Sequence, residues 1–139
     1  MALGRTKRAL VVGCGSFGAA AAMRLSNDGY SVTIADVDPS AFGALDPEFG
    51  GEAVAGDGED ISVLEECEVS LACVLLASAG RDAVNYYIAR VAAEVYGVER
   101  VFARIEDPAL IELLDDTTVE PICPHTLCVG ELCRQMRLG

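Results

Sequence analysis

The stretch Ala9-Leu10-Val11-Val12-Gly13-Cys14-Gly15-Ser16-Phe17-Gly18 decides the fold of this chain. Its first four residues are apolar and predict a buried strand, and the glycines at 13, 15 and 18 predict a turn that leads into a helix. The first glycine permits a tight turn, the second lets the backbone approach a pyrophosphate, and the third lets the helix pack closely on the strand. The helix continues through an alanine-rich segment to Leu25, and Gly29 is placed to stop it.

A second strand, predicted over 31–35, delivers Asp36 about 20 residues after the glycine turn. A carboxylate in this place can accept hydrogen bonds from both ribose hydroxyls of a dinucleotide. Val37 follows it instead of a cation, which favours a ribose without a 2′-phosphate and argues against NADP. A glycine turn alone can serve only close packing. Here strand, turn, helix, strand and terminal acid follow one another in the order that nucleotide binding requires.

The rest of the chain alternates between strand-like and helix-like segments. Strands are predicted over 52–58, 70–77, 101–105 and 118–123, and helices over 39–45, 61–66, 82–96, 108–114 and 125–137. Pro121 indicates that the last strand lies at an edge. We therefore expect one α/β domain over residues 1–139, a doubly wound parallel sheet of Rossmann type with a flexible N-terminus at 1–8.

The ends of the other predicted strands carry further candidate site residues, because ligands of such sheets bind at the carboxyl ends of the strands. Asp57 is either a partner for an adenine amino group or an ordinary turn aspartate. Ala77 and Ser78 are small, which suits a floor beneath a nucleotide, although small residues also simply end strands.

Composition argues against several classes of protein. The chain carries a net charge of −12 from 22 acidic and 10 basic residues, which should repel nucleic acid and anionic membranes. No apolar segment approaches the roughly 20 residues that span a bilayer, so we expect no direct membrane insertion. The six cysteines come without a secretory signal, and we therefore expect a cytoplasmic protein with reduced thiols.

Side chains for dehydrogenase chemistry are scarce in this sequence. Lys7 is the only lysine, and neither Tyr86 nor Tyr87 is followed four positions later by one. The tyrosine and lysine pair of short-chain dehydrogenases is therefore absent. We predict no catalytic residues.

The cysteines and the single histidine were weighed as a metal or redox site. The spacing of Cys123, His125 and Cys128 matches no compact zinc motif, so we predict no metal site and a packed or capping role for His125. Cys14 sits in the turn beside a helix N-terminus, where a thiolate can be stabilised. Redox gating through Cys14 is a hypothesis at this point.

Five motifs follow one another along the chain, at 11–18, 34–39, 55–58, 82–85 and 101–108. Together they resemble the N-terminal domain of the regulator-of-potassium-conductance family, also called RCK, KTN or TrkA-N. The resemblance extends from Ala9 to about Glu131. It implies a cytoplasmic, non-enzymatic gating module that binds NAD(H) or ATP, ADP or AMP and controls a potassium channel or transporter.

The resemblance also implies a role for each matching residue. The backbone of Gly13, Cys14, Gly15, Ser16, Phe17 and Gly18 would hold phosphates, Asp36 the ribose with Val37 beside it, Asp57 and Gly58 the adenine, Ala77 and Ser78 the pocket floor, and Arg104 a phosphate, across a dimer. Many ATP-binding members carry arginine where this chain has Ser16, which favours ADP, AMP or NAD(H).

Assembly and partners follow from the same resemblance. The family forms dimers and rings, so residues 125–139 are expected to cross to a neighbour as a dimerisation helix, with Leu127, Leu132 and Met136 near one face. The partner would be a membrane potassium channel or transporter subunit, which would place the protein at the periphery of the inner membrane. Full regulators continue into a C-terminal ligand-binding subdomain, so the chain is either a fragment of a longer protein or a minimal subunit.

Two other classes stay open from the residues alone. One is the cofactor-binding domain of an NAD-dependent oxidoreductase whose catalytic part is missing. The other is a methyltransferase that uses S-adenosylmethionine, which shares the glycine turn and the strand-end acid. That class needs a target-binding insertion that we do not find in the sequence.

Overall fold

The computed structural model describes residues 7–139, and its strands form one six-stranded parallel sheet in the order β3-β2-β1-β4-β5-β6. The strands are β1 (Arg8–Val12), β2 (Ser31–Asp36), β3 (Glu52–Ala55), β4 (Val74–Ala77), β5 (Arg100–Arg104) and β6 (Glu120–Ile122). The strand order reverses between β1 and β4, which is where ligands bind in open α/β sheets. This topology confirms the predicted doubly wound fold.

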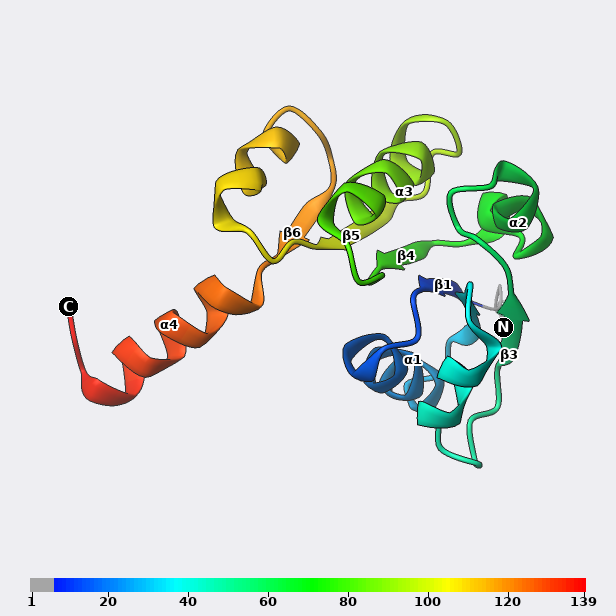
Figure 1. The fold of residues 1–139 in the computed structure, drawn as a ribbon, viewed down its shortest axis with the longest axis horizontal. Helices are drawn as coiled ribbons and strands as arrows, with labels where there is room; N and C mark the ends of the chain where they lie inside the picture. Colours follow the sequence, from blue (N-terminus) through cyan, green and yellow to red (C-terminus); the bar gives the residue numbers. More distant parts are fainter. Residues whose placement is uncertain (1–6) are drawn as a thin grey trace, which may run out of the picture.

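Helices cover both faces of the sheet (Figure 1). They are α1 (Ser16–Asn27), η1 (Pro39–Ala44), α2 (Ile61–Glu66), η2 (Val69–Leu71), α3 (Asp82–Glu94), η3 (Pro108–Leu114) and α4 (Pro124–Met136), where η marks a 3-10 helix. Helix α1 and η1 lie against one face, and α2 and α3 lie against the other. Helix α4 extends from the end of β6 away from the sheet.

The two central strands are buried on both faces, as their continuous apolar sequences predict. Residues 9–12 and all of β4 are at most 8% exposed. Leu10 and Val12 pack into the core beneath α2 and α3, whereas Ala9 and Val11 pack beneath α1. Each side chain the size of leucine that is buried in this way contributes about 2 kcal/mol. These strands therefore provide a rigid base for the loops that follow them.

Several predicted boundaries are wrong, and the largest error concerns the strand predicted over 70–77. Strand β4 begins at Val74, because Glu68 adopts a left-handed conformation (φ 58°) after α2 and a 3-10 turn at Val69–Leu71 follows. Hydrophobicity alone does not register such a turn, since Leu71 is apolar but 58% exposed. The strands predicted over 52–58 and 118–123 are likewise shorter, ending at Ala55 and spanning only Glu120–Ile122.

Smaller corrections concern helix type and the chain start. The helices predicted over 39–45 and 108–114 are 3-10 helices, each opened by a proline after an aspartate whose carboxylate accepts a backbone N–H. Of the N-terminus predicted to be flexible, residues 1–6 lie outside the described part, and Arg8 already belongs to β1. Pro121 lies in the edge strand β6, as predicted.

Asn85 is a buried polar residue that fixes the carboxyl edge of the sheet. Its side chain is 1% exposed and makes three hydrogen bonds. Its Oδ1 accepts the N–H of Ala79 at 2.7 Å, and its Nδ2 donates to the carbonyls of Ala79 and Arg104, each at 2.9 Å. Asn85 thereby ties helix α3 to the loop after β4 and to the last residue of β5.

Replacing Asn85→Ala should destabilise the fold, because it leaves two carbonyls and one N–H without their partner in a buried place. We expect the free energy of unfolding to fall by about 3 kcal/mol, measured by urea denaturation. The matched control is Asn27→Ala at the exposed end of α1, where we expect a change within about 0.5 kcal/mol. Equal effects of the two substitutions would contradict this role for Asn85.

Candidate functional site

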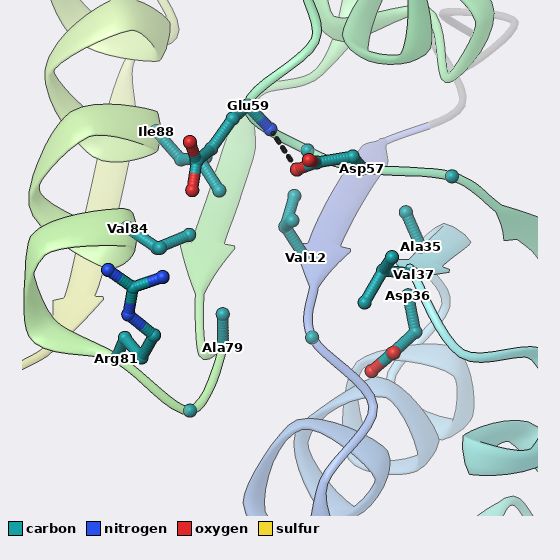
Figure 2. A pocket seen from close by; sticks show the side chains of 14 residues that line it. Val12, Ala35, Asp36, Val37, Asp57, Glu59, Ala79, Arg81, Val84 and Ile88 are labelled. Atoms are coloured by element: carbon teal, nitrogen blue, oxygen red, sulfur yellow. Dashed lines mark hydrogen bonds between the residues drawn. The ribbon is translucent and has the colours of Figure 1, made fainter.

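A cleft of about 360 Å3 lies at the carboxyl edge of the sheet, at the point where the strand order reverses (Figure 2). Its walls come from the ends of β1 and β2, the loop after β3, the loop after β4 and the start of α3. The residues that line it are Val12, Gly13, Ala35, Asp36, Val37, Gly56, Asp57, Gly58, Glu59, Ala79, Gly80, Arg81, Val84 and Ile88.

The three glycines of the turn have different structural tasks. Gly13 has φ +111°, and a Cβ there would lie 2.5 Å from the backbone of Ser78. A Cβ on Gly18 would overlap the carbonyl oxygen of Gly13. A Cβ on Gly15 would meet no atom within 4 Å, and its backbone is extended. The fold therefore needs glycine at 13 and 18, whereas Gly15 leaves space for something outside the chain.

Asp36 is held in a fixed orientation at the tip of β2. Its Oδ2 accepts the N–H of Cys14 at 2.7 Å, and its Oδ1 accepts the N–H of Asp38 at 2.9 Å. The carboxylate therefore joins the glycine turn to the end of the second strand. Each oxygen can accept a further hydrogen bond, so the carboxylate remains able to bind hydroxyl groups from the cleft.

The predicted adenine and ribose residues lie together in the cleft. Val37 is 73% exposed and lines it beside Asp36. Asp57 is exposed and accepts the N–H of Glu59 at 2.9 Å through one carboxylate oxygen. Gly58 is buried because its Cα packs against Val12 and leaves no space for a side chain.

Ala77 and Ser78 do not line the cleft as predicted. Ala77 is fully buried and Ser78 is 4% exposed. The Ser78 hydroxyl donates to the carbonyl of Gly13 at 2.9 Å and so supports the turn from below. The cleft is lined by the next two residues instead, Ala79 and Gly80.

The remaining residues of the turn and Arg104 lie outside the lining of the cleft. Gly15 and Ser16 are exposed at the start of α1, and Phe17 is half-buried beside it. The guanidinium of Arg104 lies 5.8 Å from the centre of the Phe17 ring and pairs with Glu106 at 2.5 Å. Its Nε is buried without a hydrogen-bond partner in the described residues. Arg104 thus sits on the α1 side of the sheet.

The structure argues against a redox role for Cys14. Its side chain is 2% exposed, and burial, with a smaller effect of the Asp36 charge, raises the pKa of the thiol. A raised pKa keeps the thiol protonated and unreactive at neutral pH. The expected stabilisation of a thiolate by the helix N-terminus is therefore wrong.

His125 has neither the packed nor the capping role that the sequence predicted. It is exposed near the start of α4 and makes no side-chain hydrogen bond to the described residues, while Cys123 is buried. Within residues 7–139, no group of three or more histidine, cysteine, aspartate or glutamate side chains is placed to hold a metal ion.

Sequence reasoning missed the wall of the cleft that helix α3 forms. Arg81, Val84 and Ile88 recur at spacings of three and four residues, so they lie on one face of the helix start. The sequence shows this spacing, but it does not show which face of α3 turns toward the glycine turn. Glu59 and Gly80 were missed for the same reason, since only the fold brings their loops together.

Comparison with known proteins identifies the family of the chain. The family model described as the TrkA-N domain matches residues 9–123. The Trk system potassium uptake protein TrkA of Streptomyces coelicolor is 40% identical over 127 residues, which are 91% of this chain and 57% of that protein. The chain therefore spans little more than half the length of this relative.

Solved structures share the fold. The TrkA-N domain of the inner membrane protein ybaL from Escherichia coli superposes with a TM-score of 0.82 at 14% identity, covering 96% of this chain and 98% of that one. The AMP-bound Kef C-terminal domain of Shewanella denitrificans gives 0.74 at 20% identity, with 96% and 82% covered. The GsuK channel bound to NAD gives 0.70 at 17% identity, with 89% and 22% covered.

The different tasks of the glycines predict different effects of adding one methyl group. Gly18→Ala should lower the free energy of unfolding by about 3 kcal/mol, because the backbone of the turn and α1 must separate. Gly15→Ala should change it by less than about 0.5 kcal/mol, because the added Cβ meets open space. Urea denaturation of both variants provides the test, and a large loss for Gly15→Ala would contradict the assignment.

Proposed function

The chain belongs to the TrkA-N domain family, and from this premise we propose that it is a nucleotide-sensing regulatory domain of a potassium channel or transporter. The ligand is an adenine nucleotide of the set NAD(H), ADP, AMP and ATP. Its binding shifts the population of two conformations of the regulator, which controls gating without any bond being made or broken.

The observation that carries this proposal is the pairing of an open Gly15 with a fixed Asp36 carboxylate at one cleft. The space at Gly15 allows a phosphate to approach the N-terminus of the twelve-residue helix α1, whose N–H groups favour anions. Asp36 is held by two backbone N–H groups and faces the same cleft, where it can accept ribose hydroxyls. Val37 and Asp57 continue the site toward an adenine ring.

The relatives support the class of ligand and partner. One structural neighbour is bound to AMP, and the GsuK channel is found bound to NAD and, in a further structure, to ADP. The Streptomyces relative is a potassium uptake protein. We propose that this chain binds the same class of nucleotide, with Ser16 favouring ligands that lack a γ-phosphate.

A regulatory role without catalysis fits the side chains of the cleft. The described lining contains three carboxylates and one guanidinium but no histidine, lysine, tyrosine or cysteine. These four are common proton donors, proton acceptors and nucleophiles in enzymes. The cofactor domain of an oxidoreductase is the alternative, and hydride transfer by the chain would support it.

We further propose that α4 is the element through which two copies assemble. None of its residues is buried, and its long apolar side chains are 49–60% exposed. Val129, Leu132 and Met136 share one face, whereas Leu127 lies about 140° around the axis from Leu132, so the predicted row with Leu127 is corrected. Its charged residues Glu131 and Arg134 pair with each other, which leaves an apolar face suited to its own copy.

We place the protein in the cytoplasm, at the inner membrane through a transporter or channel subunit. Among the described residues, no helix has the length and apolar character needed to cross a membrane. The net charge of −12 disfavours direct contact with anionic lipid, so attachment through a protein partner fits better.

Calorimetry with NADH, NAD, ATP, ADP and AMP tests the proposed ligand class. We expect at least one of them to bind with a Kd below about 1 mM, and Gly15→Val to abolish binding with an unchanged circular dichroism spectrum. Gly43→Val is the matched control, since Gly43 is exposed, away from the cleft, and also has open space around it. Absence of binding by the wild type would refute the proposal.

Light scattering coupled to size exclusion tests the role of α4. We expect a dimer for the wild type and a monomer for Leu132→Asp, because a charge in the centre of the apolar face opposes its burial. Leu127→Asp, on another face of the same helix, should remain dimeric. A monomeric wild type at 100 μM (about that concentration suffices for an interface of standard size) would rule out this assembly.

A further inference from the structure

We propose that Arg81 is the residue by which this cleft distinguishes phosphorylated from unphosphorylated adenine ligands. The inference rests on the proposed function and specifies which side chain supplies the charge. Arg81 precedes α3, and the sequence did not single it out as a site residue.

The charges of the lining make Arg81 exceptional. Asp36, Asp57 and Glu59 place three carboxylates around the cleft, and Arg81 is the only cation among the residues that line it. The protein as a whole is strongly acidic, with a net charge of −12. An anionic ligand is therefore repelled by most of its surroundings, and Arg81 provides the compensating positive charge within the cleft.

Arg81 is available to a ligand. It is exposed, and within residues 7–139 its side chain has no ion pair or hydrogen bond. The neighbouring Asp82 does not occupy it, because the Asp82 carboxylate accepts the N–H groups of Glu106 and Asp107 at 2.8 and 3.0 Å. Arg104 differs, since Glu106 already neutralises its guanidinium and it does not line the cleft.

The spacing along α3 matches the length of a nucleotide. Ile88, Val84 and Arg81 follow one another along the same wall (Figure 2). Ile88 packs next to Gly58, at the end of the cleft assigned to adenine, and Arg81 lies seven residues earlier, about 10 Å along the helix axis. An adenosine phosphate with its base against the apolar end thus extends its phosphate toward the guanidinium.

The bond between Arg81 and the ligand is a charge-assisted one. A guanidinium can donate two parallel N–H groups to the oxygens of one phosphate. Adenosine lacks this group and gains nothing from Arg81. The residue should therefore set the ratio of affinities between charged and uncharged ligands rather than the affinity for adenine itself.

The test compares adenosine, AMP and ADP by calorimetry on the wild type, Arg81→Gln and Arg24→Gln. We expect Arg81→Gln to weaken ADP about tenfold, which corresponds to the loss of one charge-assisted hydrogen bond, and to leave adenosine unchanged. Arg24→Gln, an exposed residue of α1 outside the cleft, should leave all three affinities unchanged. Glu59→Gln should tighten ADP about threefold by removing a like charge.

Each outcome decides between assignments. If Arg81→Gln leaves ADP affinity unchanged while the wild type binds ADP, the inference is wrong and the proposed function stands. An additional variant, Arg104→Gln, then shows whether that arginine reads the phosphate instead. An equal loss for adenosine and ADP would make Arg81 a structural residue. If the wild type binds none of the three ligands, both the inference and the proposed function are refuted.

Discussion

The structure depends on the close contact between helix α1 and the glycine turn that precedes it. At Gly18 there is no space for a Cβ, because the carbonyl of Gly13 occupies it. At Gly13 the backbone of the loop after β4 leaves no space either. This contact fixes the start of α1 against two neighbouring strands, and so it decides where the helix N-terminus points. The cleft lies beside this point because the strand order reverses there.

Polar groups, rather than apolar packing, hold the loops at the edge of the sheet. Asp36 ties the glycine turn to the end of β2, Ser78 supports the turn from below, and Asn85 joins the loop after β4 to the end of β5. Each buried group is paired, which is costly to disturb. The loops around the cleft are therefore held in place before any ligand arrives, which lowers the entropic cost of binding.

Much of the fold could be predicted because its signals are local. The apolar run of β1, the glycine spacing and the acid at the end of β2 depend on neighbouring residues only, and the edge position of β6 follows from Pro121. Boundaries failed where a turn interrupts an apolar segment, as between Val69 and Val74, since exposure of Leu71 depends on how α2 meets the sheet. The reactivity predicted for Cys14 failed because its burial depends on α1 and Asp36 together.

The sequence by itself determined the parallel α/β fold, the nucleotide-like turn and the family, since each of these depends on the order and spacing of residues along the chain. Only the tertiary structure decided which residues surround the cleft. Ala79 and Arg81 enter it and Ala77 does not, because helix α3 turns one particular face toward the glycine turn. It also separated the glycines that the backbone requires from Gly15, whose open space is visible only when neighbouring strands are in place.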